Sequence, residues 1–310
     1  MQYLQYLVYV LAFVVIALVS GNNLPACTGS IISSNIISRR KGLLLTILGY
    51  SIGFIAEGSL LRAGISSIMP VNSYLLSSVV LFSALVVFLF AHKTKVPQSL
   101  SITMSMAILG LDLAIGAKPN LGFLSEMLIA WILTSILAIW LSYSTMKHSY
   151  RFLKKKNIWR SVSSMKTLLI MVSFFTAFTL GANTLGFVYA LMPHQSAAFY
   201  VQLLGIVGIM VGSIFLSRRE LSLMGSGIVS MRYLNSLVTQ SISALFVELA
   251  TFFSIPLSNT QMYVSSIYGS TISYKTNMAH GKSIMIILRS WLIMALISIA
   301  VGYIVAAFIA

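Results

Sequence analysis

Ten long apolar runs follow one another along the 310 residues of the chain, separated by short polar or basic connections. A run of about 20 apolar residues can cross the hydrocarbon core of a membrane as a helix. Charged residues make up only 8% of the chain, whereas a soluble domain has about 25%. A soluble chain of this length could not bury so much apolar surface. The sequence therefore predicts an all-α polytopic membrane protein and excludes a soluble enzyme, a nucleic-acid-binding protein and a disordered chain.

The distribution of basic residues predicts the orientation of these runs. The expected runs are residues 3–38, 42–61, 73–91, 97–116, 121–146, 167–192, 199–216, 234–255, 256–274 and 284–309. If each crosses once from an outer N-terminus, only Arg62 and Lys118 of the 20 Lys and Arg fall outside. Basic residues concentrate on the cytoplasmic side, so we expect a multi-pass protein of the cell membrane. Both termini would lie outside and the basic stretch 147–166 in the cytoplasm. The first run could also hold a re-entrant turn, which leaves twelve membrane segments as an alternative to ten.

Two pairs of short motifs recur at a nearly constant separation. Gly21–Asn23 is echoed by Gly181–Asn183, 160 residues later, and Pro97–Ser101 by Pro256–Thr260, 159 residues later. Each half holds five runs, and because five is odd, the second half enters the membrane from the opposite side. This layout predicts an inverted-topology repeat, which is common in secondary transporters. The expected parts are the first repeat at 1–146, the cytoplasmic loop at 147–166 and the second repeat at 167–310.

The four motifs place helix-breaking and polar residues inside apolar runs, so we expect broken helices at the midplane. Backbone groups released by such a break must be satisfied within the protein or line a cavity. A half-helix N-terminus presents free N–H groups and a positive dipole end, and Ser and Thr add hydroxyl donors. These features predict an anion site built from neutral groups, at a depth where a fixed Lys or Arg is costly. The alternative is that Gly, Ser and Pro only allow close helix packing.

The paired motifs resemble the inorganic phosphate transporter (PiT) family, in an archaeal-type divergent form. That family has Gly-Ala-Asn-Asp-Val-Ala-Asn near the start of each half and Pro-Val-Ser-Thr-Thr later in each half. The resemblance implies an inverted-repeat symporter, often dimeric, that carries phosphate with a cation, while one branch carries sulfate. It also implies that the substrate-binding residues are Asn23, Ser99, Ser101, Asn183, Thr184, Ser258, Asn259 and Thr260.

The chain departs from the family at the acidic positions of the motifs. The motif aspartates fall on Leu24 and Thr184, and a family glutamate sixteen residues before the second-half proline falls on Gln240. Sodium held by backbone carbonyls at unwound turns stays an alternative. Glu57 and Glu248 lie inside apolar runs, and an acid within the membrane is a functional candidate. We therefore expect proton coupling through Glu57 or Glu248, against the alternative that both are structural.

The expected function is secondary active uptake of inorganic phosphate, driven by a proton or sodium gradient, with a sulfate permease of the same family as the alternative. Membrane lipid is the expected surrounding, a second copy of the chain the expected partner, and no resident cofactor or metal is expected. The four His show no ligand spacing, and the single cysteine, Cys27, excludes an intrachain disulfide. An intramembrane enzyme is a remote alternative, because no Ser–His or paired-Asp arrangement is visible. A cation channel would need acidic rings or a carbonyl filter.

Overall fold

The computed structural model describes residues 2–69, 73–94, 98–153, 158–193, 198–217, 233–273 and 281–309. Every regular element in these ranges is helical, which confirms the predicted all-α fold. The elements up to residue 153 are α1 (Gln2–Leu24), η1 (Pro25–Gly29), α2 (Ser30–Ser33), α3 (Arg39–Glu57), η2 (Gly58–Leu61), α4 (Arg62–Ile68), α5 (Tyr74–Thr94), α6 (Leu100–Ile115) and α7 (Leu121–Leu153). Those that follow are α8 (Ile158–Leu180), η3 (Gly181–Leu185), α9 (Gly186–Ala190), α10 (Ala198–Val211), η4 (Gly212–Leu216), α12 (Tyr233–Phe252), α13 (Asn259–Ile272) and α14 (Gly281–Ile309).

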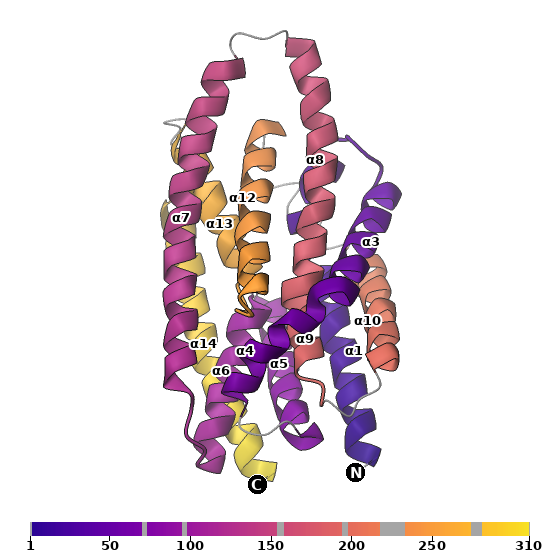
Figure 1. The fold of residues 1–310 in the computed structure, drawn as a ribbon, viewed down its shortest axis with the longest axis vertical. Coiled ribbons are helices and arrows are strands. Elements are labelled where there is room, and N and C mark those ends of the chain that lie inside the picture. Colours follow the sequence, from indigo (N-terminus) through magenta and orange to yellow (C-terminus); the bar gives the residue numbers. More distant parts are fainter. Residues whose placement is uncertain are drawn as a thin grey trace.

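The described part of the chain holds six helical stretches that are long and apolar enough to cross a membrane, not the expected ten. They are residues 2–33, 39–68, 121–149, 162–190, 198–216 and 291–309. Figure 1 places the N- and C-terminal ends at one end of the molecule, and the end of α7 and the start of α8 at the other. Residues 154–157 of the basic stretch 147–166 lie outside the described residues.

Four expected crossings form two helical hairpins instead. α5 packs against α6, and α12 packs against α13, each across a short connection. The hairpin tips meet, because the hydroxyl of Ser101 in the first turn of α6 donates to the carbonyl of Leu257 just before α13, at 3.0 Å. α6 has 16 residues and α13 has 14. At 1.5 Å per residue such helices reach only about 21–24 Å, short of a core about 30 Å thick.

This arrangement corrects one part of the charge assignment. The end of α5, which includes Lys93, lies at a hairpin tip rather than in a cytoplasmic connection. Lys95, which we also expected in the cytoplasm, lies outside the described residues.

The two Gly-Asn motifs do not break their helices. The chain passes from α1 through the π-helical turn η1 into α2, and from α8 through the π-helical turn η3 into α9. Pro25 opens the first of these turns. Because proline has no N–H, it cannot donate to the carbonyl four residues earlier, and a wider turn accommodates it. Among the described residues of the four motifs, only those at the two hairpin tips therefore interrupt a helix.

The second half of the chain repeats the helix pairings of the first half in exchanged order. α3 begins at residue 39 and α10 at residue 198, 159 residues later, and α5 and α12 differ by the same number. α1 packs against α10 while α3 packs against α8, and α6 packs against α14 while α13 packs against α7. Two matched glycines allow the last two approaches. A Cβ on Gly110 would lie 2.1 Å from the carbonyl oxygen of Ile299, and one on Gly269 would lie 2.1 Å from that of Ile139.

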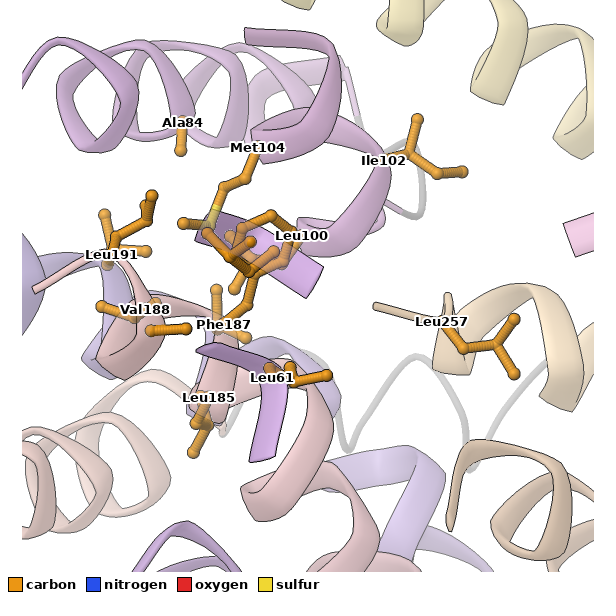
Figure 2. Packing of buried hydrophobic residues seen from close by; sticks show 14 of the residues in the cluster. Leu61, Ala84, Leu100, Ile102, Met104, Leu185, Phe187, Val188, Leu191 and Leu257 are labelled. Atoms are coloured by element: carbon orange, nitrogen blue, oxygen red, sulfur yellow. The ribbon is translucent and has the colours of Figure 1, made fainter. Parts of the chain in front are cut away.

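Buried apolar side chains fix the start of α6 against the first turns after η3. Figure 2 shows Leu100 and Met104 of α6 close to Phe187 and Val188 of α9, with Leu61 of η2 nearby. All five side chains are almost completely buried. This cluster holds the tip of the α5–α6 hairpin beside the π-helical turn that carries Asn183.

Candidate functional site

The connection before α13 is the point where three predicted site motifs converge. The backbone N–H of Leu257 donates to Asn183 Oδ1 at 3.0 Å. The carbonyl of the same residue accepts from Ser101 Oγ at 3.0 Å. Asn183 of η3 and Ser101 of α6 are far apart in the sequence, and both therefore bind the backbone of the α12–α13 connection at Leu257.

Asn183 holds the backbone of this connection with its whole side chain. Its Nδ2 group donates to Thr251 Oγ1 at 3.0 Å and to the carbonyl of Ile255 at 3.1 Å. Together with the bond to Leu257, these contacts use both amide hydrogens and the amide oxygen, and the side chain is fully buried. Asn183 is thus placed as a positioning residue. Thr251, which sequence reasoning missed, is one of its partners.

Each hairpin tip is also the N-terminus of a helix. Ser99 caps α6, since its Oγ accepts from the N–H of Ile102 at 3.4 Å, and Ser258 caps α13, since its Oγ accepts from the N–H of Gln261 at 3.2 Å. Thr260 Oγ1 lies 3.2 Å from Ser258 Oγ. The first N–H groups of a helix have no carbonyl partner within it and carry the positive end of its dipole. Two such N-termini therefore lie next to each other.

Several buried polar atoms of the described residues have no hydrogen-bond partner. Among the predicted residues these atoms are Asn23 Oδ1, Thr184 Oγ1 and Asn259 Nδ2. The other amide atom of Asn259, Oδ1, accepts from Ser243 Oγ at 3.3 Å. A buried polar atom without a partner costs about 1–3 kcal/mol, so such atoms mark places where a ligand or water can bind.

Gln98 adds an acceptor that sequence reasoning did not select. Its Oε1 atom is buried without a partner, while its Nε2 donates to Thr103 Oγ1 at 2.5 Å. The amide orientation is determined, because the Thr103 hydroxyl donates its own hydrogen to the carbonyl of Ser99 at 2.8 Å. The threonine oxygen must therefore accept from Gln98, which leaves Oε1 as a free acceptor at the tip of the α5–α6 hairpin. Its only sequence signal is its position directly after Pro97.

The structure brings the two coupling candidates together. Glu57 ends α3 and Glu248 lies in α12, and their carboxyl groups lie within hydrogen-bonding reach although they are 191 positions apart. Two carboxyl groups can share a hydrogen bond only if one of them carries a proton. The Oε2 atom of each is buried without a partner. Glu248 also precedes Thr251 by about one helical turn, so this member of the pair lies on the same helix as a partner of Asn183.

Gln240 occupies the position where the resemblance places a glutamate. Its side chain is fully buried, and its Nε2 donates to the carbonyls of Ala26 at 3.3 Å and Cys27 at 3.0 Å. The same nitrogen lies 3.0 Å from Ser30 Oγ, and Oε1 accepts from Ser173 Oγ at 2.9 Å.

These contacts decide how well the place suits sodium. The amide turns its hydrogens toward the π-turn carbonyls, which a cation would also need, so this group of atoms does not fit the ion. Among the described residues no three His, Cys, Asp or Glu side chains gather in a way that could hold a metal.

Comparison with known proteins finds relatives along the whole chain. The sequence profile of the phosphate transporter family matches residues 19–302. A Methanocaldococcus jannaschii protein provisionally named phosphate permease MJ0630 is 24% identical over 296 residues, which are 96% of this chain and 95% of that protein. The Bacillus subtilis sulfate permease CysP is 23% identical over 282 residues, which are 87% of this chain and 78% of the permease.

A solved structure shares the fold. It is described as the sodium-dependent phosphate transporter, and it matches 99% of both chains with a TM-score of 0.84 at 17% identity. The relatives are transporters and not enzymes, which confirms the expected class of protein and sets the intramembrane enzyme aside. Because the family profile spans most of the sequence, the chain belongs to the phosphate transporter family, a family of multi-pass membrane proteins.

Proposed function

We propose that this protein takes up inorganic phosphate by secondary active transport, with the two hairpin tips as the substrate site. The observation that carries the proposal is the meeting of two serine-capped helix N-termini at Leu257. Their free N–H groups and the hydroxyls of Ser258 and Thr260 supply neutral donors for an anion. Membership of the phosphate transporter family supports phosphate as that anion.

The substrate contacts follow from which side chains are free. Asn259 Nδ2 and Thr184 Oγ1 have no partner and are proposed as direct donors. The hydroxyls of Ser258 and Thr260, which lie 3.2 Å apart, are proposed as further donors that turn from each other toward the anion. Asn183, Ser99 and Ser101 hold the two tips in place through their own hydrogen bonds. Asn23, whose Oδ1 is free, is proposed as an acceptor on the opposite motif.

Phosphate and sulfate differ in one way that the site can detect. At neutral pH phosphate carries at least one proton and can donate a hydrogen bond, whereas sulfate can only accept. The unpaired acceptors Gln98 Oε1 and Asn23 Oδ1 would receive a hydrogen bond from phosphate but none from sulfate. Because an unpaired acceptor in a buried site is costly, such a site selects strongly for the anion that can donate. This favours phosphate, although similarity to a sulfate permease keeps sulfate as the second candidate.

Coupling is proposed to run through the Glu57–Glu248 pair. One proton shared by two carboxyl groups can be released and rebound as the protein exposes the pair to either side of the membrane. The pair joins α3 to α12, so its protonation state can act on the helix that ends at the second tip. Sodium is the alternative coupling ion, supported by the sodium-dependent transporter of the same fold.

The two halves, 1–146 and 167–310, are proposed to be inverted repeats joined by the cytoplasmic loop 147–166. The exchanged helix pairings and the matched approaches of Gly110 and Gly269 support this arrangement. The α5–α6 hairpin would then enter the membrane from outside and the α12–α13 hairpin from the cytoplasm. Alternating access would follow from movement of one repeat against the other.

Uptake of labelled phosphate into proteoliposomes tests the function. We expect saturable accumulation driven by an inward proton gradient, unchanged when sodium is replaced by choline, and inhibited weakly by excess sulfate. Accumulation that requires sodium and does not depend on the pH gradient would show that sodium, and not the proton, is the coupling ion. Preferential uptake of sulfate would contradict the assignment of the substrate.

A further inference from the structure

We infer that the side-chain amide of Gln240 takes the place of a cation in the oxygen cluster at η1, the π-helical turn that follows α1, and so prevents sodium from binding there. The cluster is formed by the carbonyls of Ala26 and Cys27 and the hydroxyls of Ser30 and Ser173. The inference rests on the proposed function and deepens it, because it assigns the proposed preference for protons over sodium to one residue.

The geometry around Gln240 is that of an ion site with the ion replaced. Oxygen atoms from three separate places in the chain, near residues 26–30, at residue 173 and on the amide itself, meet around a side chain that is fully buried. Carbonyls of unwound helix turns and hydroxyls are the ligands that hold sodium in membrane transporters. Here the NH2 group of Gln240 faces the oxygens of residues 26, 27 and 30, and its hydrogens carry partial positive charge, while Ser173 meets the amide oxygen.

The orientation of the amide follows from its partners. The carbonyls of Ala26 and Cys27 can only accept hydrogen bonds, so the atom that faces them must be the nitrogen. The hydroxyl of Ser173 then donates to Oε1. A neutral amide provides these donors without placing a full charge in the membrane, and it links η1, α8 and α12.

A single change should convert the cluster into a cation site. Gln240→Glu replaces the NH2 group by an oxygen and adds a negative charge. The carboxylate, the two carbonyls and the two hydroxyls then offer only oxygen ligands, the kind that hard cations prefer. Without a cation the carboxylate would repel both carbonyls, so the variant should be stabilised when sodium is present.

The test measures thermal unfolding of purified protein in detergent, with sodium chloride titrated against choline chloride at constant ionic strength. The wild-type melting temperature should depend equally on both salts. Gln240→Glu should melt lower than wild type in choline and recover by several degrees in sodium, in a saturating manner. Gln261→Glu is a matched control, because the amide of Gln261 meets one carbonyl, that of Trp131 at 3.0 Å, and the hydroxyl of Ser135 at 2.8 Å. This variant adds the same charge and should show no sodium-specific recovery.

Either of two results would overturn the inference: a sodium-specific rise in the melting temperature of wild type, or no such rise in Gln240→Glu. If Gln240→Glu does not fold, the wild-type titration decides by itself. The readout needs no substrate, so a failure of phosphate uptake would count against the proposed function and leave this inference standing.

Discussion

Asn183 determines the shape of the site without a free group of its own. Its three hydrogen bonds to Thr251, Ile255 and Leu257 hold the start of α13 so that the first N–H groups of that helix stay available. The direct contacts with the anion are then expected from the hydroxyls and backbone N–H groups at the tip. At the scale of residues, the site therefore separates side chains that position the backbone from side chains that can meet an anion.

Replacing the hydroxyls at the second tip should weaken phosphate binding. Ser258→Ala and Thr260→Ala each remove a donor beside the free N–H groups of α13, and a hydrogen bond to a charged ligand is worth about 1.5–3 kcal/mol. We expect the affinity for phosphate to fall about 10- to 150-fold in uptake assays. Ser273→Ala is the control, because its hydroxyl donates to the carbonyl of Ser270 at the other end of α13. Unchanged affinity in both tip variants would move the site elsewhere.

Removing either acid of the pair should uncouple transport from the proton gradient. Glu57→Gln and Glu248→Gln keep the size of the side chain but cannot exchange a proton. We expect accumulation against a gradient to be lost in each variant, while phosphate exchange at equal concentrations persists. Glu126→Gln is the control, since Glu126 lies exposed in α7. Proton-driven accumulation that survives both substitutions would show that the pair is structural.

At the scale of elements, the sequence predicted the helices better than their course. The 159–160-residue spacing of the motifs matches the spacing of the helix starts. Whether the runs at 73–91 and 97–116 cross or turn back could not be read from them, because a short crossing helix and half of a hairpin are equally apolar. The pairing of Glu57 with Glu248 was also hidden, since no local pattern links residues 191 positions apart. The partners of Gln240 belong to other helices and leave no trace beside it in the sequence.

The hairpins should depend on the glycines that seat them. In Gly269→Ala a methyl group would meet the carbonyl oxygen of Ile139 at 2.1 Å, so α13 must move away from α7. Such overpacking costs about 1–3 kcal/mol, which exceeds the gain of up to about 1 kcal/mol in helix propensity. We expect a lower melting temperature and weaker phosphate uptake. Gly29→Ala is the control, because its Cβ would meet only Pro25 Cβ at 3.5 Å, and its melting temperature should not fall.

At the scale of the whole molecule, the described ranges hold six long helices and two hairpins that meet tip to tip. An even number of crossings returns the chain to the side on which it began, and Figure 1 shows the N- and C-terminal ends at the same end of the molecule, with the end of α7 and the start of α8 at the other. The expected ten crossings give the same sidedness, because each hairpin replaces two crossings. The prediction that both termini lie outside therefore does not depend on whether the chain crosses six or ten times.

Labelling of single cysteines on either side of α7 tests this orientation. Lys118 and His148 are exposed and lie toward opposite ends of that helix. Cys27 is fully buried and can be replaced by alanine to give a cysteine-free background. Positive charge in the basic stretch favours the cytoplasm, so Lys118→Cys should react with an impermeant maleimide in intact cells. His148→Cys should react only after the membrane is permeabilised. The reverse pattern would show that the orientation is inverted. The α12–α13 hairpin, with Ser258 and Thr260 at its tip, would then enter the membrane from the outside.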